Sequence, residues 1–204
     1  MSHDGVTPPH TDATLREAMV PELPAGMLAH IDRVVAVADE LARRHGLDVP
    51  LARLMAQGHD LARAVPPADL LARAEARGLP IDPVERDAPV LLHGPIGALE
   101  LRERFGVTDP RVFDAIWHHT WGHPDYTPEA WAMFIADKVE PNKAKKWKAL
   151  RTVHRIALEQ SLEAAALRYL DARLKEAVRE GFTVHPQATL TRNHLLRRLR
   201  GGIA

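Results

Sequence analysis

Apolar residues recur at intervals of three and four positions along most of the chain, and this spacing predicts α-helices. The clearest stretch runs from Met27 to Leu41 and is followed by Gly46, a typical residue after a helix end. Further helices are predicted at 51–62, 70–77, 95–105, 110–120, 128–135, 145–179 and 189–200. No segment alternates apolar and polar residues as a half-buried strand would. We therefore expect an all-α protein built as a multi-helix bundle.

The chain length and the placement of prolines predict one helical domain with a short N-terminal appendage. A chain of 204 residues fits a single domain. Residues 1–24 are polar and contain four prolines, so we expect them to form a flexible lead-in. Residues 25–204 are then the domain, with a C-terminal helical extension. The long helix predicted at 145–179 could pack on its own domain or on a second copy in a homodimer.

Composition excludes several classes of protein. The absence of cysteine excludes a disulfide scaffold, a thiolate-bound metal and a thiol nucleophile. Equal numbers of basic and acidic residues, 27 of each, argue against nucleic-acid binding by bulk charge. No apolar run approaches the length of a membrane span, and the N-terminus does not resemble a signal peptide. We expect a cytoplasmic protein without a membrane partner. Residues 141–204 nevertheless carry 14 basic and 5 acidic residues, which indicates a solvated basic face or a surface that meets phosphate.

The candidate chemistry lies in a set of histidines and aspartates that the helical pattern directs inward. Its members come from five segments: His30, His59, Asp60, His93, His119 and Asp137. One inward histidine is usually a core residue, but a buried carboxylate needs a cation or strong donors. Nitrogen and carboxylate ligands suit iron, manganese, cobalt, nickel or zinc. Six ligands exceed the needs of one tetrahedral ion, so we expect two metals bridged by Asp60. Such a pair favours hydrolysis of phosphate esters or anhydrides.

The order His30, His59-Asp60, Asp137 resembles the HD-domain metal-dependent phosphohydrolases. Longer stretches are similar to the bacterial YqeK family within that group. They are residues 59–82, LLHGPIGA (91–98), HHTWG (118–122), IADKVEPNK (135–143) and VHPQATLTRNHLL (184–196). The resemblance implies hydrolysis of symmetrical diadenosine tetraphosphate (Ap4A) to two ADP, with water activated to hydroxide at a binuclear iron-type centre. One metal would be held by His30, His59, Asp60 and Asp137, and the other by His93, His119 and the bridging Asp60.

The resemblance also implies roles for residues around the metals. Asp60, Arg63 and Lys138 are the expected catalytic residues. The expected substrate-binding residues are Arg63, Trp121, His123, Lys138 and Arg192. Arg63 stands where the family commonly has lysine, and His123 where it often has arginine.

Three alternatives stay open at this point. One is another HD-type nucleotide phosphohydrolase, either a nucleotidase or a phosphodiesterase. A second is a metal-binding or nucleotide-binding module without turnover. The third is a nucleic-acid contact through Trp147 and the lysines between 143 and 148.

Overall fold

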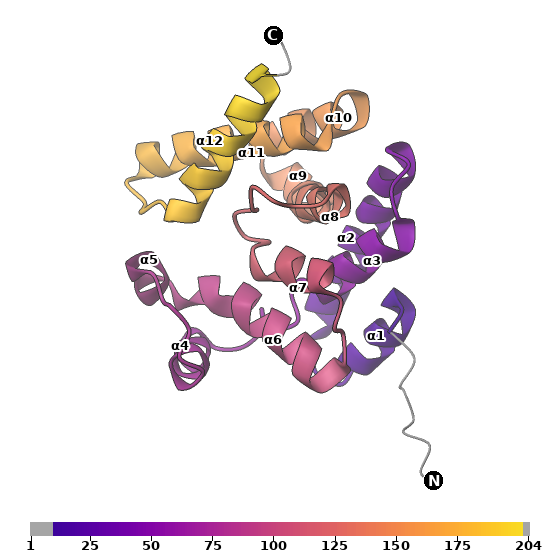
Figure 1. The fold of residues 1–204 in the computed structure, drawn as a ribbon, viewed down its shortest axis with the longest axis vertical. Helices are drawn as coiled ribbons and strands as arrows, with labels where there is room; N and C mark the ends of the chain where they lie inside the picture. Colours follow the sequence, from indigo (N-terminus) through magenta and orange to yellow (C-terminus); the bar gives the residue numbers. More distant parts are fainter. Residues whose placement is uncertain (1–9, 202–204) are drawn as a thin grey trace.

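The computed structural model describes residues 10–201, and within this range all regular structure is helical (Figure 1). The α-helices are α1 (Asp12–Met19), α2 (Ala25–Arg44), α3 (Val49–Gly58), α4 (Pro67–Ala76), α5 (Pro83–Asp87), α6 (His93–Phe105), α7 (Pro110–Trp117), α8 (Pro128–Val139), α9 (Pro141–Lys146), α10 (Ala149–Glu159), α11 (Leu162–Glu180) and α12 (Pro186–Gly201). A 3₁₀ turn, η1 (Pro89–Leu92), precedes α6. The predicted all-α class is confirmed.

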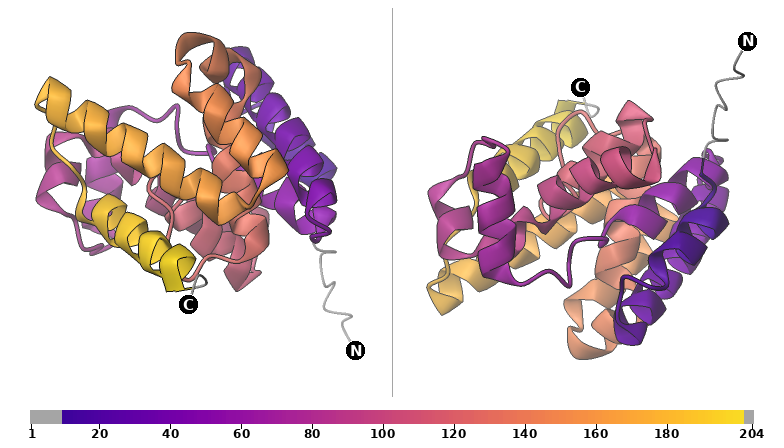
Figure 2. Two further views of the ribbon diagram at one scale, coloured as in Figure 1. Left: turned by 90° about the horizontal axis from the view of Figure 1, so that it is seen from above. Right: turned by 90° about the horizontal axis from the view of Figure 1, so that it is seen from below.

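Helices α2, α3 and α8 pack against one another at the centre of the molecule. They contribute fully buried side chains such as Ile31, Met55 and Phe134 to one large core. In Figure 1, α10, α11 and α12 lie above this centre, and α4 and α6 lie below it; the views in Figure 2 show the same layers from above and below. A smaller apolar cluster packs α4 and η1 onto α6.

Polar residues at the starts of helices fix where the helices of the centre begin. Asp48, Asp109 and Thr127 lie just before α3, α7 and α8, and each side chain accepts a hydrogen bond from a backbone N–H of the first turn. Each of these helices also has proline in its first two positions, where the missing N–H costs nothing. These starts set the register of the helices that carry or flank the candidate site.

The structure corrects the predicted N-terminal lead-in. Helix α1 lies within residues 1–24, begins with a capping box at Thr11 and buries Leu15 and Met19. It packs against α3. The prolines at 21 and 24 lie between α1 and α2, so they end one helix and precede the next without interrupting either. Residues 1–9 of the predicted lead-in lie outside the described residues.

The prediction of one long helix at 145–179 is also wrong. The segment is divided among α9, α10 and α11. The backbone of Gln160 leaves the helical region, with φ −126° and ψ −97°, and the Ser161 hydroxyl accepts a hydrogen bond from the N–H of Ala164 to start α11. Helix α7 ends at Trp117 and not near residue 120, and α5 and η1 form in a proline-rich stretch where no helix was expected.

The break before α11 leads to a stability prediction. We expect Ser161→Ala to lower the free energy of unfolding by about 1 kcal/mol, because an N–H of the first turn loses its acceptor. For a chain of this size that change lowers the melting temperature by about 2–4 °C in a thermal unfolding experiment. Ser161→Thr keeps a hydroxyl and serves as the control. Equal melting temperatures for wild type and Ser161→Ala would contradict the role of this cap.

Candidate metal centre

The structure brings all six sequence-predicted metal ligands together in the interior. They form two groups of three: His30, His59 and Asp137 in one, and Asp60, His93 and His119 in the other. Within each group, one ligand atom from each residue lies within 4.8 Å of the others. The side chains come from α2, the turn after α3, the start of α6, the turn after α7 and the last part of α8.

Asp60 lies between the two groups and turns one oxygen to each. Its Oδ2 is 3.5 Å from His30 Nε2 and 3.4 Å from His59 Nε2. Its Oδ1 is 3.3 Å from His93 Nε2 and 3.5 Å from His119 Nε2. Two ligands about 2.1 Å from one ion, at roughly 90–109° to each other, are about 3.0–3.4 Å apart. The spacing therefore fits two coordination shells that share one carboxylate.

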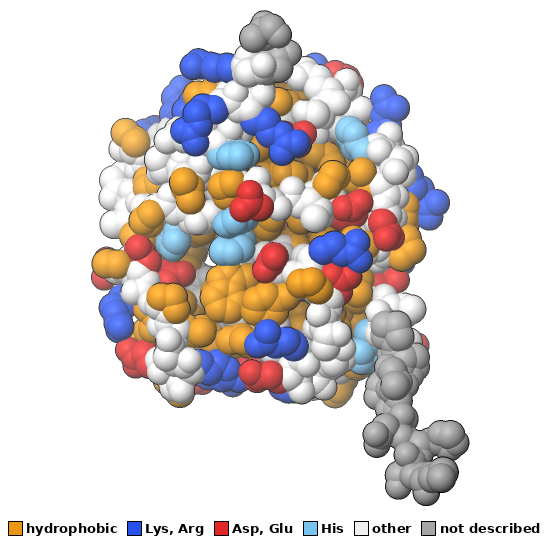
Figure 3. All heavy atoms as spheres, in the orientation of Figure 1, with side chains coloured by type: hydrophobic (Ala, Val, Ile, Leu, Met, Phe, Trp, Pro, Cys, Tyr) orange, Lys and Arg blue, Asp and Glu red, His pale blue; other side chains and the backbone are white. Residues whose placement is uncertain are grey.

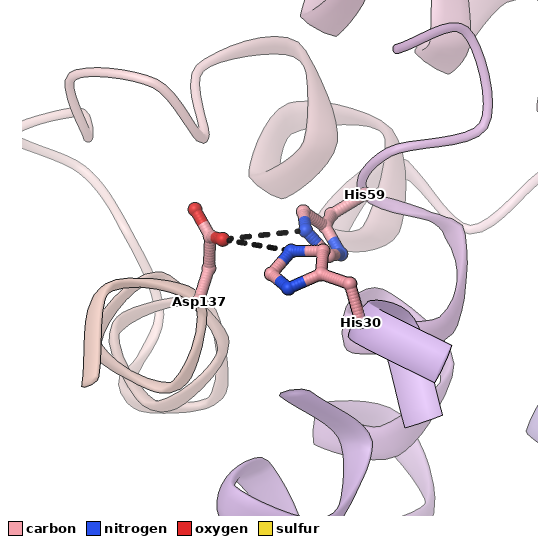
Figure 4. A group of neighbouring side chains, drawn as sticks. All are labelled: His30, His59 and Asp137. Atoms are coloured by element: carbon pink, nitrogen blue, oxygen red, sulfur yellow. Dashed lines mark ion pairs between the residues drawn. The ribbon is translucent and has the colours of Figure 1, made fainter. Parts of the chain in front are cut away.

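Asp137 completes the first group, and lysines balance its charge. Its Oδ1 is 3.4 Å from His30 Nε2 and 3.5 Å from His59 Nε2, and Figure 4 shows both imidazoles facing this oxygen. Lys138 Nζ donates to Asp137 Oδ2 at 2.6 Å and to the backbone carbonyl of His119 at 3.1 Å. Lys143 Nζ donates to Oδ1. The buried Lys138 thus links the two groups, because it bonds Asp137 of the first and the carbonyl of His119 of the second.

Three of the four histidines are oriented by carbonyl groups at the ends of helical turns. The Nδ1 atoms of His59, His93 and His119 each bond the carbonyl three residues earlier; these carbonyls belong to Ala56 at 2.7 Å, Val90, and Ile116 at 2.8 Å. Carbonyls in the last turn of a helix lack intrahelical partners. A carbonyl oxygen can only accept, so each Nδ1 donates the hydrogen of this bond and each Nε2 faces the cluster, where it can bind a metal in place of a proton.

The fourth histidine uses a carboxylate that sequence reasoning missed. His30 Nδ1 is 3.6 Å from Glu140 Oε1. Glu140 is buried, receives a hydrogen bond from Arg33 Nε at 2.6 Å and accepts the first N–H groups of α9. Burial opposes ionisation, but the bonds from Arg33 and the Asn142 N–H hold the pKa of Glu140 below its usual value. A carboxylate that ends an apolar helix directly before Pro141 was the signal that could have identified it.

The electrostatics of the cluster favour a cation. Burial raises the pKa of Asp60 and Asp137, but His59 acting on Asp60, and Lys138 and Lys143 acting on Asp137, hold both values well below the usual range. Burial lowers the pKa of His119 to about 4, with neighbouring histidines acting in the same direction, so this imidazole is neutral.

His59 shows most directly what the cluster lacks. Burial lowers its pKa, but the two carboxylates outweigh burial and raise the pKa to about 10. Its Nε2 is fully buried and has no hydrogen-bond partner among the described residues. A metal ion would replace that proton and satisfy the orphaned nitrogen, so the donor set fits a bound metal.

A cavity of about 430 Å³ lies beside the Asp60–His93–His119 group and contains part of the predicted substrate site. Trp121 lines it and stacks on His185, with ring centroids 5.7 Å apart. His118 also lines it and stacks on His123 at 4.5 Å. On the face seen in Figure 3, histidine side chains lie among hydrophobic ones near the middle of the molecule. The contribution of His185 from the tail of the chain was not foreseen.

The two predicted arginines are placed differently from each other. Arg63 is exposed in the turn that follows Asp60, and its backbone N–H donates to the carbonyl of Asp60. Arg192 donates to Asp171 at 2.8 Å and to Asn193, so its guanidinium is engaged between α11 and α12. Among residues 10–201, the hydrogen bonds and ion pair of the Arg192 guanidinium are with Asp171 and Asn193 and not with the candidate metal ligands.

Gly94 permits the close approach that brings the second group together. A Cβ at Gly94 would lie 2.8 Å from the carbonyl oxygen of Trp117 and 3.1 Å from that of Ile116, both backbone atoms. We expect Gly94→Ala to lower the free energy of unfolding by about 1–3 kcal/mol and to separate α6 from the end of α7. Urea unfolding and a crystal structure of the variant would measure both effects.

Gly97→Ala is the matched control in the same helix. Its Cβ would meet Ala62 atoms at 3.6 and 3.7 Å, which is ordinary contact, so we expect no loss of stability. If the two variants were equally stable, the close approach at Gly94 would not constrain the site.

Comparisons with known proteins agree with this geometry. Residues 27–142 match the family model described as HD domain, a span that includes all six candidate ligands. The chain is 30% identical over 167 residues to the symmetrical bis(5'-nucleosyl)-tetraphosphatase of Bacillus subtilis (strain 168), which covers 82% of this chain and 88% of that protein. It is 28% identical over 181 residues to the protein of the same name from Halalkalibacterium halodurans, covering 86% and 92%.

A solved structure shows the same fold. It comes from Clostridium acetobutylicum and is described as a predicted HD superfamily hydrolase involved in NAD metabolism. It superposes with a TM-score of 0.85 at 25% identity and covers 93% of this chain and 99% of that chain. The resemblance seen in the sequence motifs is confirmed: the chain belongs to the HD-domain family and, within it, to the family of the symmetrical bis(5'-nucleosyl)-tetraphosphatases.

Proposed function

We propose that this protein is a metal-dependent hydrolase that cleaves symmetrical dinucleoside tetraphosphates such as Ap4A into two nucleoside diphosphates. The observation that carries the proposal is the position of Asp60, whose two oxygens face two separate pairs of imidazoles. The names of the relatives from Bacillus subtilis and Halalkalibacterium halodurans support the choice of substrate.

The ligand set supports two ions. His30, His59, Asp137 and one oxygen of Asp60 would hold the first, and His93, His119 and the other oxygen of Asp60 would hold the second. Iron follows from the family resemblance, and the same donors accept manganese, cobalt, nickel or zinc. Bound metals would lower the pKa of water and draw charge from phosphoryl oxygens.

The residues around the ligands position them and bind phosphate. Lys138 uses two of its donors on Asp137 and the His119 carbonyl, so it holds the two groups at a fixed separation. Its third N–H would donate to a phosphate oxygen. Glu140 lies 3.6 Å from His30 Nδ1 and would favour the ring orientation that presents Nε2 to the cluster. Arg63 is exposed near Asp60 and would bind a phosphate with the fork of its guanidinium.

The cavity lined by Trp121 and His118 would take one nucleoside. It lies next to the second group, because His118 precedes His119 and because Leu91 and Pro95, on either side of His93, also line it. Indole and imidazole faces stack on a nucleobase. His123 stacks on His118 and would support this wall, which is an indirect role in substrate binding. The role of Arg192 stays a prediction from the sequence.

Within residues 10–201, none of the helices combines the length and the apolar character that crossing a bilayer requires. The cytoplasmic location and the homodimer stay predictions from the sequence.

The proposed activity predicts a product pattern. Protein loaded with Fe²⁺ or Mn²⁺ under reducing conditions should convert Ap4A to ADP alone, as measured by chromatography of the products. Asp60→Asn keeps the shape of the side chain but removes the charge that two ions would share. We expect it to lower kcat at least about 100-fold and to reduce the metal content.

Asp69→Asn is the matched control, because Asp69 is exposed on α4 and lies outside the cluster and the cavity. Release of inorganic phosphate from nucleotides, with Ap4A left intact, would assign the chain to another HD-type activity. Full activity of Asp60→Asn would contradict the proposed centre.

A further inference from the structure

Several basic residues from the C-terminal part of the chain line a second pocket, to which the proposed function assigns no role. This pocket has a volume of about 290 Å³ and lies among α8, α9 and α11. We call it the basic–aromatic pocket; its lining includes Lys138, Lys143, Lys146, Trp147, Tyr169 and Arg173.

The basic–aromatic pocket adjoins the candidate metal centre. Lys138 and Lys143 both line it, and both donate hydrogen bonds to the carboxylate of Asp137. A ligand in the pocket would therefore lie one side chain away from the His30–His59–Asp137 group. The cavity lined by Trp121 has the corresponding position beside the other group.

The wall of the pocket has a surplus of positive charge. Of its four cationic side chains, Lys138 and Lys143 share Asp137, and Arg173 pairs with Glu176. Lys146 is exposed and has no ion-pair partner among residues 10–201. The lining residues of the pocket include none that is acidic. A concave site with this balance attracts an anion with more than one charge.

Aromatic side chains add a surface for a flat group. Trp147 is half-buried in the wall and meets Tyr169 edge to face, with ring centroids 6.3 Å apart. The Arg173 guanidinium lies 5.9 Å from the Trp147 ring. An indole that is partly open to solvent and next to cations can stack on a nucleobase while the cations bind its phosphates.

We propose that the basic–aromatic pocket binds a nucleoside diphosphate, the half of the substrate that lies on the Asp137 side of the centre. The proposal rests on the proposed function, because a bond cleaved at the middle of a symmetrical substrate leaves two equal halves to be held. The two pockets then hold one half each, and the metal-ligand groups lie between them. A volume of about 290 Å³ favours a small ligand over a nucleic acid.

The test is a calorimetric titration of the metal-loaded, full-length protein with ADP. Wild type should bind two ADP per chain. Lys146→Glu should weaken one of these sites at least about tenfold and raise KM for Ap4A, with the metal content unchanged. Lys145→Glu is the matched control, because Lys145 is exposed on the same helix and does not line the pocket. Trp147→Ala should weaken the same site.

The outcomes separate this inference from the proposed function. If Lys146→Glu and Lys145→Glu bind ADP alike while wild type cleaves Ap4A, the pocket assignment is wrong and the function stands. If wild type leaves Ap4A intact but the Lys146→Glu variant binds one ADP fewer than wild type, the pocket is a nucleotide site and the proposed reaction is wrong. Loss of single-stranded RNA binding in Lys146→Glu, with ADP binding unchanged, would overturn the inference in favour of a nucleic acid.

Discussion

The buried carboxylate of Asp60, shared by four imidazoles, is the constraint on which the rest of the structure depends. An ionised carboxylate in a protein interior is costly unless charges or strong donors compensate it. Here each oxygen faces its own pair of histidines, and Asp137 adds a second carboxylate beside one pair. Histidines alone leave the Nε2 of His59 without a partner, so the arrangement is complete only with cations. Five separate segments have to converge on this point.

The fold achieves this convergence with the ends of helices. His59, His93 and His119 each follow a helical turn or its last residues and bond a carbonyl that such an end leaves free. The caps of the helices and close approaches such as that at Gly94 position the helix ends. The carbonyl groups at these ends then orient the imidazole rings. Lys138 and Glu140, both at the end of α8, extend the same arrangement outward to the second group and to α9.

Much of the fold and the inward direction of two candidate ligands could be predicted from the sequence, because both depend on local periodicity; His59, Asp60 and His119 lie in turns beyond the ends of α3 and α7. The apolar spacing that predicts α2 and α8 also predicts which way His30 and Asp137 point, and the cost of burying a carboxylate favours a metal. The helix at 12–19 and the role of Glu140 depend on packing between distant segments. The meeting of Trp121 with His185 depends on where the tail docks, which no local pattern encodes.

The central claim is that Asp60 joins two metal ions, and anomalous scattering tests it most directly. A crystal of the Mn²⁺-loaded or Fe²⁺-loaded protein, measured on both sides of the metal absorption edge, should show two anomalous peaks about 3.5–4 Å apart. One peak should lie among His30, His59 and Asp137 and the other between His93 and His119, with one Asp60 oxygen bound to each. A single peak, or two peaks of which only one contacts Asp60, would contradict the account.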